Sequence, residues 1–382
     1  MDLLRQREPA VAVVTRRRAW PVLLTMLVLA VLTNLLLPGP ASAEGTSAEK
    51  SVYINTTTEG DGPRTPDIIS TSANNAVVAW REGLSPNKVD MGYIRYSYTT
   101  DGGANWSRPR TLAQETDKYA CHYVILYQVG DEIFAYLGRT PATSTNGLPI
   151  DTVVVKRSTD EGHTWQDYPV NMPTGLGNII FAGRPLKVGN RHVIPFWITT
   201  GRKNGVLISY DLKNWTVGDI VPGGDTYTAG EPQIAVSQDN ANDLVMVARA
   251  ANPKAVMATS HNVGDSWEGF APNADLPSYD IAKSYFTKDS TGQYLYIYNT
   301  GTDKANRDVL NYKARRPGQP WRAGKLFADG PESEKDPTPV GTGALWDNYA
   351  MADEYAPGKF FVVWEFDTSR IKVNKLDISD AP

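Results

Sequence analysis

Short apolar runs of strand length recur along the chain in pairs, and a short polar turn separates the two runs of each pair. The turns carry dipeptides such as Asn74-Asn75, Gly130-Asp131 and Pro357-Gly358, which are typical of β-hairpins. Six hairpins of this kind occupy residues 68–80, 123–137, 184–198, 232–248, 285–298 and 349–364. The pattern therefore predicts an all-β chain built from six similar units.

A second pattern, Ser-x-Asp-x-Gly-x-x-Trp, recurs between the hairpins with a period of roughly 50–60 residues. Its most complete copy is Ser158, Asp160, Gly162 and Trp165. The other copies, some of them incomplete, are Thr99-Asp101-Gly103-Trp106, Ser209-Asp211-Trp215, Ser260-Asn262-Gly264-Trp267 and Gly318-Trp321. These residues suit a β-turn, because the carboxylate accepts backbone N–H groups and the glycine adopts a positive φ.

A third strand follows each hairpin, and the Asp turn then leads into a fourth strand. Six units of four strands predict a six-bladed β-propeller. The sixth unit has a third strand at 371–376 but no residues for a fourth, so residues 50–56 are expected to complete that blade and close the ring. Antiparallel order places the start of strand 1, the end of strand 2 and the start of strand 3 on one face, here called the entry face. The Asp turns lie on the opposite face, and we expect them to be structural.

Residues 1–43 have the pattern of a secretory signal peptide. Three arginines at 16–18 precede an apolar run at 22–37, and the small residues at 41–43 form a cleavage site. The run is nearly long enough to span a bilayer, so a retained membrane anchor is the alternative. We expect a secreted protein that is free of the membrane after cleavage, with residues 44–382 as one catalytic propeller domain.

Charge and composition exclude several classes of partner. The formal net charge is −4, and removal of residues 1–43 takes away five Arg, one Asp and one Glu, a net of +3, which leaves −7. An acidic surface argues against nucleic acid as a partner. The single cysteine, Cys121, cannot form an intrachain disulfide, and four scattered histidines show no metal-ligand spacing. We expect no metal, no cofactor and a monomer.

Charged and phenolic residues gather at entry-face positions of several different units. Each of them starts a first strand, ends a second strand or lies in the loop between the second and third strands. The set comprises Arg64, Asp90, Glu231, Arg249, Arg307, Tyr349 and Glu365. We therefore expect three arginines, three carboxylates and a tyrosine around one opening on the propeller axis, at the entry face.

In these residues the chain resembles the bacterial sialidases (exo-acting neuraminidases), whose repeated turns are called Asp-boxes. Arg64-Thr65-Pro66 is similar to that family's Arg-Ile-Pro motif, and the resemblance extends from about residue 52 to 376. It implies a sialidase-like propeller that cleaves terminal α-linked sialic acid with retention. The implied roles are Tyr349 as nucleophile, Glu231 as its base, Asp90 as general acid/base, Arg64, Arg249 and Arg307 as carboxylate ligands, and Glu365 as the partner that orients Arg64.

The residue types also suit this chemistry in physical terms. Three guanidinium groups bind the carboxylate on the anomeric carbon of sialic acid through charge-assisted hydrogen bonds. An anionic nucleophile would be repelled by that carboxylate, so a neutral tyrosine with a carboxylate base is better suited. Asp90 would protonate the leaving oxygen and later activate water.

Several positions have competitors or depart from the family pattern. The competitors are Glu82 for Asp90, Tyr355 for Tyr349, and Arg315 or Arg316 for Arg307. Further pocket residues are expected among His122, Arg184, Trp197 and the loop 140–151. The segment 329–345 is long for the family, and Thr65 and Asp67 replace the usual apolar neighbours of the first arginine.

Four functions compete at this point. The expected one is a secreted sialidase, and the nearest alternative is a hydrolase of a related 2-keto acid sugar such as deaminated sialic acid. An unrelated glycosidase such as an exo-arabinanase would not need three arginines, because its substrate lacks a carboxylate. A non-catalytic carbohydrate-binding propeller would not need Asp90, Glu231 and Tyr349 together.

Overall fold

The computed structural model describes residues 50–54, 62–83, 88–175, 177–251, 253–279, 282–300, 307, 309–329, 347–367 and 369–379. All of them belong to one compact unit, Thr46–Pro382. The expected signal peptide, 1–43, and most of the long segment 329–345 lie outside the described residues. Among the described residues, no helix has the length and apolar character needed to cross a membrane.

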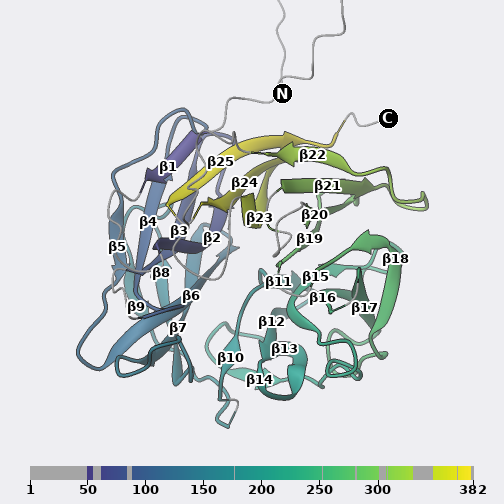
Figure 1. Cartoon of the computed structure of the whole chain (residues 1–382), viewed down its shortest axis with the longest axis horizontal. Coiled ribbons are helices and arrows are strands. Elements are labelled where there is room, and N and C mark those ends of the chain that lie inside the picture. The colour runs from purple at the N-terminus through teal and green to yellow at the C-terminus, as the bar shows by residue number, and fades with distance from the viewer. Residues whose placement is uncertain are drawn as a thin grey trace, which may run out of the picture. The chain divides into compact units, whose positions relative to one another are not determined.

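The described strands form six antiparallel sheets, which are the blades of a six-bladed β-propeller (Figure 1). Blade 1 contains β2 (Gly62–Ser70), β3 (Ala76–Gly83), β4 (Tyr93–Thr99) and β5 (Arg110–Ala113), and blade 2 contains β6 (Tyr119–Val129), β7 (Glu132–Pro141), β8 (Thr152–Ser158) and β9 (Gln166–Tyr168). Blade 3 contains β10 (Ile179–Ile180), β11 (Leu186–Val188), β12 (Arg191–Ile198), β13 (Lys203–Ser209) and β14 (Trp215–Val217), with a short 3-10 turn at Thr200–Arg202. Blade 4 contains β15 (Gly230–Val236), β16 (Leu244–Arg249), β17 (Lys254–Ser260) and β18 (Ala271–Pro277). Blade 5 contains β19 (Tyr285–Lys288), β20 (Tyr294–Thr300), β21 (Val309–Arg315) and β22 (Lys325–Ala328), and blade 6 contains β23 (Asp347–Ala356), β24 (Lys359–Phe366), β25 (Arg370–Asp377) and β1 (Lys50–Ile54).

The ring closes as the sequence pattern predicts, through an N-terminal strand in the last blade. Strand β1 pairs antiparallel with β25, from Lys50 opposite Val373 to Ile54 opposite Arg370. The two ends of the propeller therefore share one sheet, in which β1 pairs with the edge of β25 and is itself the outermost strand of blade 6.

The Asp turns are local hydrogen-bonded units that join strands 3 and 4. In the second blade, Asp160 Oδ1 accepts the Thr164 N–H at 2.9 Å, and Ser158 Oγ accepts the Gly162 N–H at 2.8 Å. Gly162 has a φ of +84°, and a Cβ there would meet a methyl group of Val77 in blade 1 at 2.2 Å. Glycine is therefore required both by the turn and by the packing of neighbouring blades.

The first strands of the blades contact one another around the axis, and several of them carry a β-bulge. The pairing register shifts between Arg64 and Asp67, between Gly230 and Gln233, and between Asn348 and Met351. The bulged segments contain Thr65, Glu231 and Tyr349, whose φ values are +48°, +51° and +53°. A bulge with a left-handed residue redirects a side chain out of the regular strand alternation, and such strained positions cluster at functional sites.

Candidate active site

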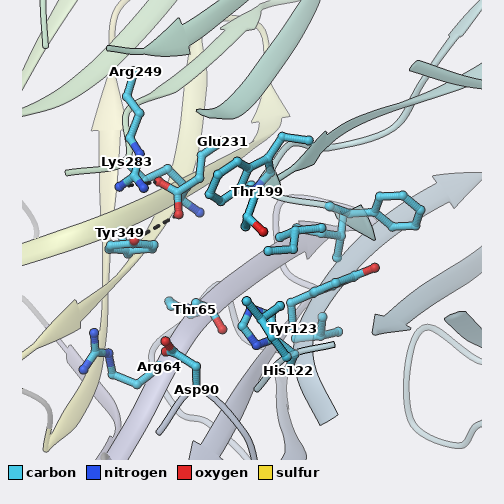
Figure 2. A pocket seen from close by; sticks show the side chains of 18 of the residues that line it. Arg64, Thr65, Asp90, His122, Tyr123, Thr199, Glu231, Arg249, Lys283 and Tyr349 are labelled. Carbon is cyan, nitrogen blue, oxygen red and sulfur yellow. Dashed lines mark hydrogen bonds and ion pairs between the residues drawn. The ribbon is translucent and has the colours of Figure 1, made fainter. Parts of the chain in front are cut away.

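A cavity of about 230 Å³ opens at the entry face, and it has one charged wall and one apolar wall (Figure 2). The charged wall includes Arg64, Asp90, Glu231, Arg249, Lys283 and Tyr349. The apolar wall includes Tyr123, Leu148, Ile180, Phe181 and Trp197. This combination suits a ligand that has an anionic group at one end and carbon-rich surface at the other.

Tyr349 and Glu231 meet across the axis, although they come from blades 6 and 4. The Tyr349 hydroxyl donates a hydrogen bond of 2.9 Å to Glu231 Oε1, and Arg249 Nη1 lies 2.9 Å from Glu231 Oε2 (Figure 2). Both Tyr349 and Glu231 occupy the bulges described above, which turn their side chains toward each other. The carboxylate is thereby held between a proton donor and a cation.

The protonation state of Tyr349 is set by opposing effects. Burial raises the pKa of Tyr349 to about 12, and the negative charge of Glu231 acts in the same direction. Arg307 and Arg249 oppose this increase. Tyr349 is therefore a neutral phenol at physiological pH, and it becomes a strong nucleophile only when its proton moves to a base.

Arg64 and Glu365 form a second ion pair at the cavity. Arg64 Nε lies 2.9 Å from Glu365 Oε2, and the side chain of Glu365 is fully buried. The Glu365 carboxylate also accepts the backbone N–H of Thr65. Glu365 therefore fixes both the side chain of Arg64 and the bulge that carries it.

The third predicted arginine, Arg307, belongs to the same cluster. Its Nη2 lies 3.4 Å from the Tyr349 hydroxyl, and its guanidinium carbon lies 5.0 Å from the centre of the Tyr349 ring. The structure thus brings Arg64, Arg249 and Arg307 to one end of the propeller, as their entry-face positions predict. Among the described groups on this wall, four cations (Arg64, Arg249, Lys283, Arg307) face three carboxylates (Asp90, Glu231, Glu365), an excess of one positive charge.

Asp90 faces the cavity from the loop between β3 and β4. Its Oδ1 lies 3.2 Å from Arg81 Nη2, and its side chain is 49% exposed because it borders the open cavity. The surrounding protein tends to raise the pKa of Asp90, but the positive charges of Arg81, His122, Arg64 and Arg307 outweigh this effect and hold the pKa below its usual value.

Its competitor Glu82 is engaged elsewhere. Glu82 accepts a hydrogen bond from the Tyr53 hydroxyl of β1, and its other oxygen lies 3.3 Å from Arg95 Nε. Glu82 is 2% exposed and does not line the cavity. The geometry therefore favours Asp90 as the carboxyl group that meets a ligand.

The other competitors also lie away from the cavity. Tyr355 is near the far end of β23, where its ring packs 4.7 Å from that of Phe361. Arg315 Nε donates to the Gln319 carbonyl in the turn after β21. Arg316 reaches the Ser379 carbonyl. None of the three lines the cavity.

Most of the additional pocket residues expected from the sequence do line the cavity. His122, Trp197 and two residues of the loop 140–151, Asn146 and Leu148, are among them. Gly147 of that loop has a φ of +70°, and a Cβ there would meet the Asp90 carbonyl and His122 Nδ1 at 2.3 Å each. The loop therefore packs directly on the Asp90 segment.

The expectation for Arg184 is wrong. Arg184 Nη2 lies 2.5 Å from Asp67 Oδ1, and Nη1 pairs with Asp353, deep between blades 1, 3 and 6. The first strand of blade 3 begins at Ile179 and is interrupted before Leu186, so Arg184 lies partway along it rather than at its entry-face end. This buried cluster also explains why Asp67 replaces an apolar neighbour of the first arginine.

Lys283 is the main site residue that the sequence analysis missed. It lies two residues before the first strand of blade 5, near the entry-face end of that strand. The positional signal was therefore present in the sequence, but the resemblance to sialidases assigns no residue there.

The sequence of residues 74–356 matches the family described as BNR repeat-like domain. No curated protein matches the chain significantly. Three solved structures with a similar fold are the Hadza microbial sialidase Hz136, the leech intramolecular trans-sialidase in complex with 2,7-anhydro-Neu5Ac, and the intramolecular trans-sialidase from Ruminococcus gnavus in complex with oseltamivir carboxylate.

These structures are similar over most of the chain but distant in sequence. The Hz136 sialidase has 15% identity and a TM-score of 0.66, over 86% of this chain and 68% of that chain. The leech enzyme has 14% identity and a TM-score of 0.63, over 87% and 71%. The Ruminococcus enzyme has 12% identity and a TM-score of 0.63, over 88% and 99%. By its sequence match over more than half of its length, the chain belongs to the BNR repeat-like domain family, on a fold that it shares with sialidases.

Proposed function

We propose that this protein is a secreted, retaining exo-glycosidase that hydrolyses terminal α-linked sialic acid through a tyrosine nucleophile. The observation that carries the proposal is the 2.9 Å hydrogen bond from the Tyr349 phenol to Glu231 in a cation-rich cavity. A phenol held against a carboxylate is a nucleophile with its base already in place. The fold that the chain shares with sialidases supports the substrate class.

Substrate binding follows from the charges of the cavity. Arg64 and Arg249 line the cavity, Arg307 lies 3.4 Å from the Tyr349 hydroxyl, and together they suit the carboxylate of a 2-keto acid sugar. Glu365 keeps Arg64 oriented through its 2.9 Å ion pair. The apolar wall on the opposite side would hold the remainder of the sugar ring.

The first chemical step forms a bond between Tyr349 Oη and the anomeric carbon. The phenolic proton moves to Glu231 Oε1, along the hydrogen bond that already exists. The bond from the anomeric carbon to the glycosidic oxygen breaks, and protonated Asp90 gives its proton to that oxygen. The products of this step are a tyrosyl glycoside and the free aglycone alcohol.

The second step hydrolyses the tyrosyl glycoside. Asp90, now a carboxylate, takes a proton from a water molecule that attacks the anomeric carbon. The bond to Tyr349 Oη breaks, and Glu231 returns its proton to the phenolate oxygen. Two displacements at one carbon retain the anomeric configuration.

The proposal is tested by turnover of 4-methylumbelliferyl α-N-acetylneuraminide, with proton NMR to identify the first product. We expect hydrolysis by the wild type with the α-anomer appearing first. The NMR spectrum also distinguishes free sialic acid from the 2,7-anhydro product that is bound in the leech enzyme.

Variants assign the roles of the residues. Tyr349→Phe and Glu231→Gln should each lower kcat at least about 100-fold, and the double variant should be little worse because the two residues act as one unit. Tyr355→Phe is the matched control, since Tyr355 lies at the far end of the same strand, and it should retain wild-type kcat. Near-normal kcat in Tyr349→Phe would overturn the assignment.

The same assay separates the rival functions. Faster turnover of the deaminated analogue than of the N-acetylneuraminide would identify the protein as a hydrolase of that related sugar. Binding of either sugar without turnover would identify a carbohydrate-binding propeller, in which the hydrogen bond between Tyr349 and Glu231 has no catalytic use.

A further inference from the structure

Lys283 contributes a cation to the charged wall of the cavity, beside the Tyr349–Glu231 pair. The residue is 4% exposed, and its side chain lines the cavity close to Glu231 (Figure 2). Its Nζ lies 5.3 Å from the centre of the Tyr349 ring. Lys283 lies two residues before β19, so blade 5 supplies this cation just as blades 1 and 4 supply Arg64 and Arg249.

The side chain of Lys283 is nearly buried, and its ammonium faces the cavity and the ring of Tyr349. No hydrogen bond or ion pair joins it to the described residues, whereas Arg64 pairs with Glu365 and Arg249 pairs with Glu231. Burial lowers the pKa of Lys283, and the negative charges of Glu231, Asp67 and Glu365 partly oppose this effect. A largely desolvated cation that is not held by an ion pair with a described residue is costly to keep, so its presence at this site points to a use.

A bound substrate would increase the share of the positive charge at Tyr349 that comes from Lys283. A substrate carboxylate would compensate the charges of Arg249 and Arg307, the two cations that otherwise favour negative charge on Tyr349. Lys283 faces the ring of Tyr349, and its charge is not among those assigned to the substrate carboxylate. Its field then acts on the phenolic oxygen at the moment when the proton leaves.

We propose that Lys283 is a positioning residue, whose charge stabilises the negative charge that develops on Tyr349 as Glu231 accepts the phenolic proton. This inference rests on the proposed function, because it assigns Lys283 a part in the same nucleophilic step. The charged groups around the pair are Glu231, Glu365, Arg249, Arg307 and Lys283, with Asp67 and Arg184 beneath them.

The kinetic test uses Lys283→Met, which keeps an unbranched side chain of similar length and removes the charge. Lys288→Met is the matched control. Lys288 lies on β19, lines a separate cavity and donates to the Ser237 carbonyl. Lys283→Met should lower kcat about tenfold or more, and Lys288→Met should not change it. Binding of the unreactive analogue 2-deoxy-2,3-didehydro-N-acetylneuraminic acid should stay within about threefold of wild type, because the arginines still hold its carboxylate.

Thermal unfolding distinguishes this role from a structural one. Removal of an unpaired buried charge should leave Tm unchanged or raise it, so that Lys283→Met becomes less active without becoming less stable. A lower Tm in Lys283→Met would mark the lysine as a structural residue and overturn the proposal. A large loss of analogue binding with unchanged kcat would show that Lys283 contacts the ligand instead, and would also overturn it.

A measurement that needs no turnover separates this inference from the proposed function. Incorporation of 3-fluorotyrosine at position 349 allows the phenol to be titrated by fluorine NMR. The pKa of this phenol should be higher by about one unit in the Lys283→Met background, because a nearby cation favours the phenolate. If the wild type hydrolyses no sialoside but Lys283→Met still raises the pKa of the phenol at position 349, the proposed function fails and the effect of Lys283 on Tyr349 stands. An unchanged pKa in an active enzyme overturns the role of Lys283 alone.

Discussion

The residues of the charged wall influence one another mainly through charge, and a bound anion would alter that balance. In the free site, burial tends to raise the pKa of Asp90, and four cations hold it below its usual value. Arg64 and Arg307 are two of these cations, and both are proposed to bind the substrate carboxylate. Once that carboxylate compensates them, the pKa of Asp90 rises and the acid form persists to higher pH.

This coupling predicts two different alkaline limits. Asp90 must be protonated to donate to the leaving oxygen, so activity falls as pH rises through its pKa. The limit in kcat/KM reports the free enzyme, and the limit in kcat reports the complex. We expect the kcat limit at a higher pH than the kcat/KM limit for an alkyl sialoside, measured from pH 3 to 9. Coincident limits, or the reverse order, would contradict the coupling.

At the scale of single elements, the bulged first strands direct side chains into the cavity, and the Asp turns stabilise the connections between the outer strands of the blades. Strand β8 runs from Thr152, just after the loop that lines the cavity, to Ser158, where the turn begins. The turn is therefore a full strand length from the site. The repeated Ser and Asp residues are polar enough to suggest a functional site in the sequence. In the structure, the side chains of Ser158 and Asp160 form hydrogen bonds within the turn itself.

Asp160→Ala tests whether the Asp turn contributes to stability alone. The substitution removes the acceptor for the Thr164 N–H, so we expect the free energy of unfolding to fall by about 1 kcal/mol with kcat unchanged. Urea denaturation and turnover of the same preparation measure the two quantities. Asp131→Ala, in an exposed hairpin turn, is the control and should change neither. A large loss of kcat in a stably folded Asp160→Ala protein would refute a purely structural turn.

The sequence predicts the features that depend on local chemistry, and it misses those that depend on where a strand begins. The Asp turns and hairpins were predictable because their residues specify turns directly. The face of each site residue followed from antiparallel order, which places Tyr349 and Glu231 correctly. The sequence pattern misplaces Arg184, because the first strand of blade 3 is irregular and begins at Ile179. The bulges at Thr65, Glu231 and Tyr349 were not predictable, since none of these residue types requires a positive φ.

At the scale of the whole propeller, the ring is closed by a short strand from the other end of the chain. Tyr53 on β1 ties this strand to blade 1 as well as to blade 6. Its ring stacks on Trp80 of β3 with 5.1 Å between ring centres, and its hydroxyl donates to Glu82. The closure therefore depends on side chains across the blade boundary in addition to the β1–β25 backbone pairing.

Replacement of Tyr53 should weaken closure without affecting the active site. Tyr53→Ala removes the ring that stacks on Trp80 and leaves Glu82 with Arg95 as its remaining partner, so we expect a loss of about 2 kcal/mol in the free energy of unfolding. Tyr53→Phe keeps the stack and should lose about 1 kcal/mol, the value of one hydrogen bond. Neither should change kcat at low temperature, because Tyr53 does not line the cavity.

Tyr210→Ala is the control, since Tyr210 is 59% exposed on the third blade. Urea unfolding followed by tryptophan fluorescence gives the stabilities, and equal losses for Tyr53→Ala and Tyr210→Ala would show that the β1–β25 hydrogen bonds close the ring unaided.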